Sequence, residues 1–450
     1  MKRKFYDVLL EWKAKRANKF ALLIDGARRV GKSYIAEEFA RNEYERYLLI
    51  DFSRASKAVK SIFEEQLHDL DVFFMMLETE LHVKLIPGKS LVVFDEVQEF
   101  PRAREAIKTL VADGRYHYLE TGSLISIKKN TEGIVIPSEE MHRKMYPMDF
   151  EEFLWATGHD SSMELMREFF EKRKPLGQAI NRRIMEIYRQ YLVVGGMPQS
   201  VLEFVSSHDL AEVDVQKRVI LDLYRADIWK HAGSLAPKVE RVFDGIPDQL
   251  SRHEKKFRIS SLEGDAKMRD YADAFTWLES AQFANLCWNS TDPNVGLKMN
   301  LDRKSVKCYM ADTGLLVSHA FDENALIAED IHRRLLTDRI ELNCGMLVEN
   351  MSAQMLVASG HRLYFHSESN PSVAADRMEI DFLVAKSKLT RRHNISPIEI
   401  KGGSNITHAS LNKFRMKYAE WCGESFLFDD KDLRIEAGVT HLPHYLLPLV

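Results

Sequence analysis

The sequence has few of the features that mark secreted, membrane-spanning or zinc-binding proteins. Its 450 residues include only 4 cysteines, which form no C-x-x-C pair. This argues against a cysteine zinc site and favours a reducing compartment. No run of about 20 apolar residues is present to cross a membrane, and the basic N-terminus lacks a signal peptide's apolar stretch. We therefore expect an intracellular, cytoplasmic protein with no membrane partner.

Neither sign of charge dominates the chain. It carries 63 Lys and Arg against 67 Asp and Glu, which gives a formal net charge of −4. No basic field over the whole chain therefore attracts nucleic acid, and any DNA binding must be local. The length is sufficient for roughly two to four domains, each with its own core.

One segment has the pattern of a phosphate-binding loop. Residues 20–33, FALLIDGARRVGKS, read as an apolar strand followed by G-x-x-x-x-G-K-S, with a periodic helix after it. The glycines allow a tight turn whose N–H groups point at phosphate oxygens, a lysine reaches the β- and γ-phosphates, and a serine hydroxyl binds Mg²⁺. The predicted nucleotide-binding residues are Gly26, Ala27, Arg28, Arg29, Val30, Gly31, Lys32 and Ser33. The pattern predicts ATP and Mg²⁺ as cofactors.

A second strand supplies the acidic groups that nucleotide hydrolysis needs. Leu91–Phe94 is an apolar run typical of a buried parallel strand, and Asp95 and Glu96 follow it. Ligands bind at the carboxyl ends of strands in doubly wound sheets, so both carboxylates are expected beside the loop. Asp95 is predicted to bind Mg²⁺ together with Ser33, and Glu96 to deprotonate the attacking water.

A third strand ends where a sensor of the γ-phosphate is expected. The apolar strand Tyr116–Glu120 is followed by Thr121, Gly122 and Ser123. Thr121 and Ser123 are candidate catalytic residues. The alternative is an ordinary turn, which glycine and serine favour for backbone reasons.

The order of predicted elements divides the chain into four parts. Residues 1–158 alternate strand and helix, residues 159–235 are a helical linker or lid, residues 236–320 have the order of a winged helix, and residues 321–450 form a last α/β domain. An N-terminal amphipathic helix is expected to pack on the first domain. Ser61–Leu81 is predicted to be one long helical stretch.

The winged-helix region contains a local basic cluster. Lys255, Lys256 and Arg258 lie between two predicted helices, and Lys267 and Arg269 begin the second of them. These side chains are positioned to meet DNA phosphates if the domain binds DNA. Acidic neighbours dilute the charge, and winged helices also serve as protein contacts, so both alternatives stay open.

The last domain contains a second group of chemically active residues. Glu349 lies on a predicted helix, Asp381 on the strand Met378–Ala385, and Glu399 and Lys401 lie two apart on a short strand, so that they face the same side. Carboxylates suit Mg²⁺, and a lysine can steady a hydroxide nucleophile. This is the D…E-x-K arrangement of restriction-endonuclease-like folds. A surface ion pair on an edge strand is the alternative.

The order of motifs resembles one known prokaryotic family. The motifs are DGARRVGKS, VVFDEVQEFP, TGS, YPMDFEEFL, VGGMP, CYMADTGLL, GMLVEN and EIDFLV followed by PIEIKGG. In this order they resemble AAA+-like P-loop ATPases with a C-terminal restriction-endonuclease-like, PD-(D/E)XK-type domain of unknown function. The resemblance implies an ATP-binding domain, a winged-helix linker and a nuclease-like tail. Where members carry Gly-Arg, this chain reads His142–Arg143, and Arg143 is the implied phosphate-sensing or finger arginine.

The sequence thus predicts an α/β protein with an AAA+-like parallel sheet that hydrolyses ATP with Mg²⁺ and acts on nucleic acid. An ATP-gated DNA nuclease that uses Glu349, Asp381, Glu399 and Lys401 is a second hypothesis. A nucleotide-switch scaffold that binds a protein partner is a third. DNA and a protein are therefore the candidate partners besides ATP, and the oligomeric state stays open.

Overall fold

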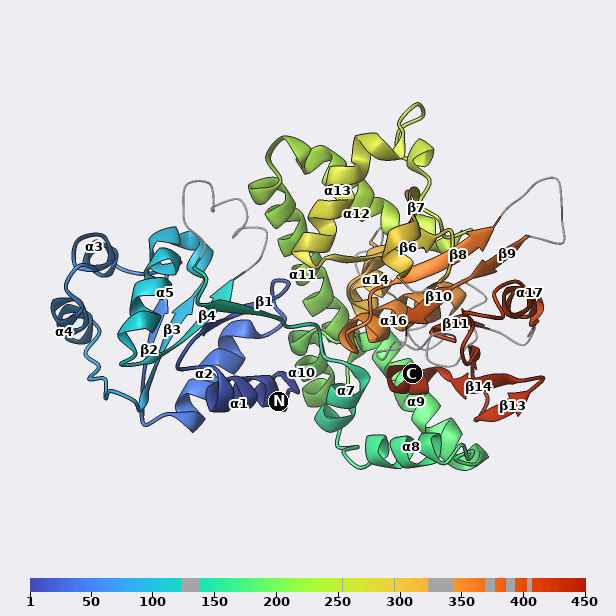
Figure 1. Cartoon of the computed structure of the whole chain (residues 1–450), viewed down its shortest axis with the longest axis horizontal. Coiled ribbons are helices and arrows are strands. Elements are labelled where there is room, and N and C mark those ends of the chain that lie inside the picture. The colour runs from blue at the N-terminus through green and yellow to red at the C-terminus, as the bar shows by residue number, and fades with distance from the viewer. Residues whose placement is uncertain are drawn as a thin grey trace. The chain divides into compact units, whose positions relative to one another are not determined.

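The computed structural model describes residues 1–122, 137–252, 254–294, 296–322, 344–368, 377–385, 393–402 and 407–450. The chain divides into two compact units, Met1–Tyr146 and Pro147–Val450. The first unit is drawn in blue to teal in Figure 1, and the second in green to red. No helix of the described part is both long and apolar enough to cross a membrane.

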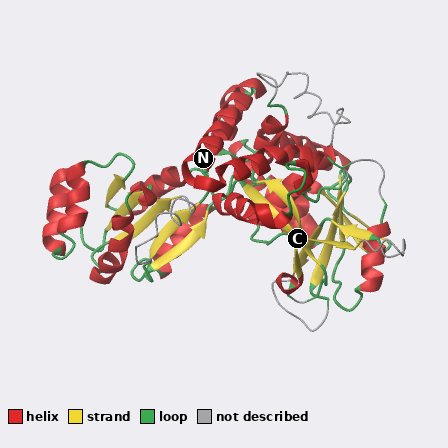
Figure 2. Cartoon of the chain, turned by 90° about the horizontal axis from the view of Figure 1, so that it is seen from above, coloured by secondary structure: helices red, strands yellow, loops and turns green. Residues whose placement is uncertain are grey.

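The first unit is built on a five-stranded sheet of order β2-β3-β4-β1-β5, and all its strand pairs are parallel. This confirms the predicted parallel α/β sheet. Figure 2 shows its strands in yellow and its helices in red. The strands are β1 (Ala21–Asp25), β2 (Arg46–Asp51), β3 (Ser90–Asp95), β4 (His117–Gly122) and β5 (Glu140–Lys144). The helices are α1 (Phe5–Lys15), α2 (Lys32–Glu43), α3 (Lys57–Glu65), α4 (Leu70–Glu80), the 3₁₀ turn η1 (Val97–Glu99) and α5 (Pro101–Asp113).

The strand sequences explain why this sheet forms. Every residue of β1 and of β3 is buried, as expected for a parallel strand covered on both faces. Helix α1 contacts α2 and buries Phe5, Leu9 and Trp12, which confirms the predicted N-terminal helix.

The prediction of one long helix over Ser61–Leu81 was wrong, because the segment contains parts of two helices. The first helix, α3, ends at Glu65, and α4 begins at Leu70. Asp69 causes the restart, since its side chain accepts hydrogen bonds from the N–H groups of Asp71 and Val72 and so caps α4.

The second unit combines helices with two sheets. Its helices are α7 (Phe150–Ala156), α8 (Ser162–Glu171), α9 (Gln178–Val194), α10 (Pro198–Ser207), α11 (Leu210–His231), α12 (Ala236–Ser251), α13 (Met268–Ala281), α14 (Thr313–Ala320), α16 (Cys344–Ala358) and α17 (Ala409–Lys417). Short 3₁₀ turns are η2 (Gly233–Leu235), η3 (Ile259–Ser261), η4 (Leu297–Asn300) and η6 (His444–Leu449). The strands are β6 (Ala284–Ser290), β7 (Leu301–Met310), β8 (Tyr364–Glu368), β9 (Met378–Ile380), β10 (Phe382–Ala385), β11 (Ile395–Ile400), β12 (Phe426–Asp429), β13 (Arg434–Glu436) and β14 (Val439–Pro443).

The predicted winged-helix order of two helices and a strand pair is present as α12, α13, β6 and β7. However, the β6–β7 pair does not form a sheet of its own. Strand β6 also pairs with β8, in a four-stranded sheet of order β7-β6-β8-β9. Elements assigned by sequence to two domains thus share one sheet, and the four-domain division stays a prediction.

The predicted strand Met378–Ala385 is interrupted at Asp381. Strand β9 before it pairs with β8, whereas β10 after it pairs with β11 in a five-stranded sheet of order β10-β11-β12-β14-β13. Asp381 therefore lies at the junction of two sheets, which a simple alternating pattern does not reveal.

Candidate nucleotide site and acidic cluster

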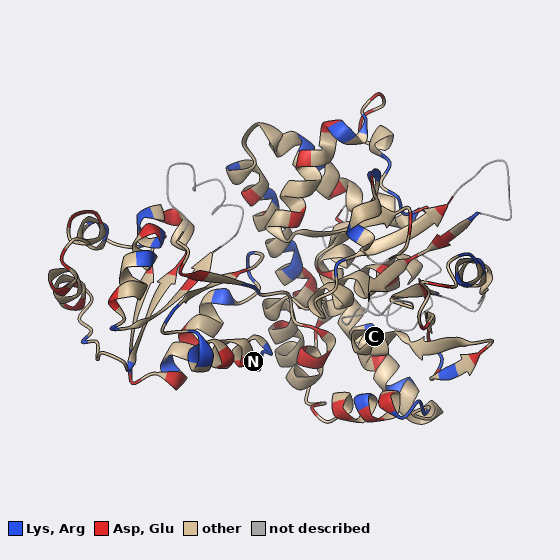
Figure 3. Cartoon of the chain, viewed as in Figure 1, with Lys and Arg blue, Asp and Glu red and all other residues tan. Residues whose placement is uncertain are grey.

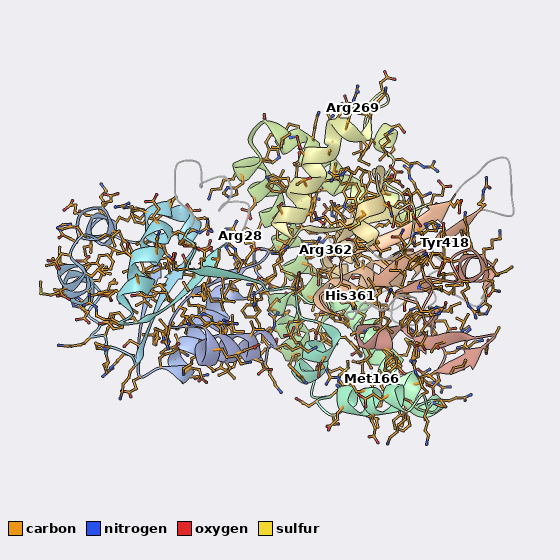
Figure 4. The ribbon with its side chains drawn as sticks, viewed as in Figure 1. Arg28, Met166, Arg269, His361, Arg362 and Tyr418 are labelled. Atoms are coloured by element: carbon orange, nitrogen blue, oxygen red, sulfur yellow. The ribbon has the colours of Figure 1, made fainter. Side chains whose placement is uncertain are left out.

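The predicted phosphate-binding loop joins the end of β1 to the start of α2. Gly31 has φ +96°, and a Cβ on Gly26 would lie 2.6 Å from the carbonyl oxygen of Met145, so both positions require glycine. The ammonium of Lys32 donates to the carbonyls of Gly26 and Ala27 at 2.9 Å each. Burial lowers the pKa of Lys32, against the raising effect of nearby carboxylates. Arg28, labelled in Figure 4, is exposed on this loop.

The predicted Mg²⁺ ligands meet at one carboxylate oxygen. Ser33 Oγ donates to Asp95 Oδ1 at 2.7 Å, and Thr121 Oγ1 donates to the same oxygen. Strand β4, which carries Thr121, pairs with both β1 and β3, so this hydroxyl lies between the loop and the acidic strand. Three separate sequence motifs therefore meet at one end of the sheet.

Glu96 has an unusual backbone conformation. Its φ is +53°, in the left-handed region that non-glycine residues rarely adopt, and such strain is concentrated at functional sites. Its backbone N–H donates to Thr121 Oγ1 at 3.2 Å, and Gln98 Nε2 donates to its carboxylate. The backbone and the carboxylate of the predicted base are therefore both held by neighbouring side chains.

Arg143 and Ser123 were also predicted to be catalytic residues. Arg143 is exposed on the edge strand β5, where it donates to the carbonyl of His142 at 3.0 Å. Ser123 lies outside the described residues.

Sequence reasoning missed Arg3, which forms a hydrogen bond to the backbone of the phosphate loop. This buried side chain donates to the carbonyl of Val30 at 2.9 Å and to that of Tyr146 at 2.7 Å. Its position in a basic N-terminal run resembles a solvated charge cluster, so the sequence contains no signal for this role.

In the second unit the predicted acidic residues do come together. Glu349 lies on α16, Asp381 at the β9–β10 junction, and Glu399 near the end of β11. The buried ammonium of Lys307, from β7, lies 3.3 Å from Glu349 Oε1 and 3.6 Å from Asp381 Oδ1. It also lies 2.9 Å from Glu379 Oε1. We call Glu349, Glu379, Asp381, Glu399 and the lysines that contact them the acidic cluster.

Glu399 and Lys401 form an ion pair, with 2.9 Å between Oε1 and Nζ. Unlike a surface pair on an edge strand, Glu399 is buried on β11, which has a neighbour on each side. Its Oε2 has no hydrogen-bond partner among the described residues. Burial, reinforced by Asp381, raises the pKa of Glu399 to about 7, against the lowering effect of Lys401. Burial also raises the pKa of Asp381, whose Oδ2 accepts from the Ile400 N–H at 2.9 Å.

Lys307, Tyr309 and Glu379 were not among the predicted residues, and Lys255 was predicted only to contact DNA phosphates. Tyr309 donates to Glu349 Oε1 at 2.5 Å, and Lys255 donates to Oε2. Burial raises the pKa of Glu349, but Lys307 and Lys255 outweigh it and bring the pKa to about 2. Lys307 lies in the buried second half of β7, between the apolar residues Val306 and Cys308, and a lysine at such a position is the signal that could have identified a buried charge.

Two of the predicted DNA-contacting lysines, Lys255 and Lys256, have partners within the chain. Lys255 binds Glu349, and Lys256 donates to Ser367 Oγ at 2.6 Å. Arg269, labelled in Figure 4, is 80% exposed and lies 3.5 Å from an Asp270 oxygen. Figure 3 shows that blue and red residues are interspersed along α11 to α13. Phosphate contact by Lys255 or Lys256 would therefore have to break existing interactions.

Three family models match successive segments of the chain. The AAA domain matches residues 18–154, a domain of unknown function (DUF8612) matches residues 185–325, and another (DUF4143) matches residues 344–445. Together with the loop geometry, the first match identifies residues 18–154 as an AAA-type P-loop ATPase domain. The restriction-endonuclease-like identity of the last segment stays a prediction.

Two solved structures are distant matches. The structure of C. elegans PCH-2 shares 16% identity over 46% of this chain, with a TM-score of 0.24, and the match spans 60% of PCH-2. The helicase domain of Pyrococcus furiosus Hef shares 13% identity over 61% of this chain and 79% of its own, with a TM-score of 0.18. No curated protein matches.

Proposed function

We propose that the first unit binds MgATP at residues Gly26–Ser33 and hydrolyses it, with Glu96 as the general base. The observation that carries this proposal is the shared oxygen Asp95 Oδ1, which accepts from both Ser33 and Thr121. A hydroxyl from the loop and a carboxylate from the end of the acidic strand β3 are the pair that binds Mg²⁺ in phosphoryl transfer.

Each side chain then has a defined role. Lys32 leaves the carbonyls of Gly26 and Ala27 and binds the β- and γ-phosphates, whose charge compensates for its burial. Asp95 and Ser33 are the residues that would bind Mg²⁺, which neutralises phosphate charge when it is bound. Glu96 accepts the proton of the attacking water. The Thr121 hydroxyl connects the backbone of Glu96 to the carboxylate of Asp95.

The test is ATP turnover and binding in matched variants. Glu96→Gln keeps shape but removes the base, so we expect retained MgATP binding and a turnover lower by about 100-fold or more. Lys32→Ala should lose nucleotide affinity as well as turnover. Glu99→Gln, an exposed acid three positions further on, should behave as wild type. Unchanged turnover in Glu96→Gln would show that another group activates the water.

The acidic cluster supports a second activity, in which the second unit binds a divalent cation and acts on nucleic acid. The buried Oε2 of Glu399, which has no hydrogen-bond partner among the described residues, is an available oxygen ligand beside Asp381. Lys401 is adjacent to Glu399 and could steady a nucleophile or a strained phosphate. Lys307 already neutralises Glu349 and Asp381, so a cation must compete with its ammonium.

This second activity is tested with single- and double-stranded DNA. ATP turnover is measured with and without DNA, and products are separated on a gel with Mg²⁺ or Mn²⁺ present. If the cluster cleaves DNA, Asp381→Asn and Lys401→Ala should each abolish cleavage and leave DNA-independent ATP turnover intact. Cleavage that survives both changes would remove the cluster from the mechanism. Turnover that responds to a protein and not to DNA would favour the nucleotide-switch scaffold.

A further inference from the structure

A group of two histidines and a glutamate lies outside both sites. His408 immediately precedes α17, Glu436 ends β13, and His441 lies in β14; these are dark red elements of Figure 1. One ligand atom of each residue lies within 4.8 Å of the ligand atoms of the other two. We propose that these three side chains bind a divalent transition metal, with Zn²⁺ as the ion that best fits their chemistry.

One ring nitrogen of each histidine has no hydrogen-bond partner among the described residues. His441 is fully buried, and its Nε2 has no hydrogen-bond partner among the described residues; the buried Nδ1 of His408 has none either. A buried polar atom without a partner costs about 1–3 kcal/mol, so native structures rarely retain one. The two rings are close, with centroids 4.9 Å apart. A metal ion bound to both rings would satisfy both nitrogens.

Glu436 is oriented to complete the site. Its Oε1 accepts from Arg434 Nε at 2.9 Å, whereas its Oε2 lies 3.7 Å from His441 Nε2. The carboxylate therefore presents one oxygen to the histidine, and the arginine fixes the other. Ligand atoms of a tetrahedral Zn²⁺ site lie about 3.3 Å apart, so this pair would need to approach by only about 0.4 Å.

The surroundings of His441 supply the outer partner that metal-binding histidines need. Asp429 Oδ2 lies 3.5 Å from Nδ1, and a metal-bound imidazole places its proton on that nitrogen for such a carboxylate. Arg434 Nη2 also lies 2.7 Å from Nδ1 and 2.6 Å from Asp429 Oδ2. Metal binding therefore requires Arg434 to give up the imidazole and keep Asp429.

The donor set selects the type of metal. Two imidazole nitrogens and one carboxylate suit Zn²⁺, whereas Mg²⁺ prefers oxygen ligands, as in the acidic cluster. Three protein ligands leave a fourth position for water. The metal would connect the start of α17 to the β13–β14 pair. Both of these parts follow Glu399 and Lys401 in the sequence.

The test measures Zn²⁺ binding by the full chain in a Mg²⁺ buffer, by equilibrium dialysis and elemental analysis. Wild type should bind one Zn²⁺ that Glu436→Ala and His408→Ala each bind about 100-fold more weakly or not at all. Glu436 is 54% exposed, so its replacement should not unfold the unit, and circular dichroism checks this. Bound Co²⁺ should show a visible absorption spectrum that Glu436→Ala lacks.

Two controls separate this site from others. His68→Ala removes an exposed histidine of the first unit and should keep the bound Zn²⁺. Asp381→Asn alters the acidic cluster and should keep it as well, so failure of the proposed nuclease does not affect this result. Absence of Zn²⁺ binding by wild type, or unchanged binding by folded Glu436→Ala, would overturn the proposal.

Discussion

At the scale of single residues, one threonine hydroxyl connects the proposed metal ligand to the proposed base. Thr121 Oγ1 donates to Asp95 and accepts from the Glu96 N–H. Thr121→Val keeps the shape but removes both bonds, so ATP turnover should fall by roughly 10- to 100-fold. MgATP affinity should change less, because Lys32 and the loop remain. Thr79→Val, at an exposed position of α4, is the control; equal turnover in both variants would contradict this role.

Lys307 is the central charge of the acidic cluster. Its removal in Lys307→Met leaves Glu349, Glu379 and Asp381 without their shared cation, which should destabilise the unit by about 3–5 kcal/mol. Mg²⁺ should recover part of this loss if it binds the freed carboxylates. Urea unfolding with EDTA and with Mg²⁺ measures both effects, and Lys304→Met, exposed on the same strand, is the control. A variant as stable as wild type in EDTA would show that Lys307 does not neutralise the cluster.

These two sites differ in how far the sequence could predict them. The phosphate loop is contiguous, so its glycines, Lys32 and Ser33 identify it without knowledge of the fold. The acidic cluster is assembled from strands that are distant in sequence, and Lys307 precedes Glu349 by 42 positions. Asp381, Glu399 and Lys401 could be recognised by their D…E-x-K spacing. The contact of Lys307 with Glu349 could not, because only tertiary packing brings β7 to α16.

At the scale of elements, the end of α9 meets the start of α14 without room for a side chain. Gly195 has φ +80°, and a Cβ there would lie 2.2 Å from Asp312 Oδ1. Gly177, at the other end of α9, has φ +92° but no atom near its Cβ position. Gly177→Ala should therefore cost about 1–2 kcal/mol for backbone strain alone. Gly195→Ala should cost about 3 kcal/mol or more, because a clash is added. Equal midpoints in urea would show that the contact relaxes.

Helix α11 carries a buried lysine against α9. Lys217 Nζ donates to the Val193 carbonyl at 3.0 Å, and burial lowers its pKa to about 8, against Asp214 and Asp312. In the unfolded chain, Lys217 has its ordinary pKa of about 10.4 and stays protonated up to that pH. Below about pH 8 the lysine is charged in both states, and burial of this charge destabilises the folded state. As the pH rises above 8 the folded state loses the proton first, so this destabilisation is relieved.

The expected effect is a stability gain at alkaline pH. Between about pH 7.5 and about pH 9.5, wild type should gain roughly 2 kcal/mol relative to Lys217→Met, which cannot titrate at this position. Urea unfolding of both proteins across this pH range gives their free energies of unfolding. The difference between the two proteins removes the contribution of all other titrating groups, because both proteins share them. Parallel stability curves would show that the pKa of Lys217 is not lowered.

Element boundaries follow from the sequence where an amphipathic pattern is uninterrupted, and they were missed where a single side chain decides. The bounds of α13, Met268–Ala281, follow from an uninterrupted amphipathic pattern. The restart at Asp69 and the bend at Asp381 each depend on one carboxylate. Asp69 caps a helix, which is a recognisable local signal. Asp381 accepts from the Ile400 N–H of another strand, and no local pattern contains that information.

At the scale of the whole molecule, each of the two compact units has its own apolar core. One core lies within the parallel sheet of the first unit, and another surrounds β11 and α17 in the second. A ligand that binds one folded unit stabilises that unit by mass action, by about 2.7 kcal/mol at 100 times its dissociation constant. If the units unfold independently, only the unit that binds the ligand gains stability. If their unfolding is coupled, the other unit gains stability as well.

We expect calorimetry of Glu96→Gln, which should bind MgATP without consuming it, to show two unfolding transitions. MgATP should raise the midpoint of one transition, assigned to Met1–Tyr146, and leave the other unchanged. The double variant Lys32→Ala, Glu96→Gln should show neither shift, since Lys32 is the proposed phosphate ligand. A single transition that moves as a whole would contradict independent units. It would mean instead that nucleotide binding is transmitted to Pro147–Val450, as an ATP-gated activity of the acidic cluster would require.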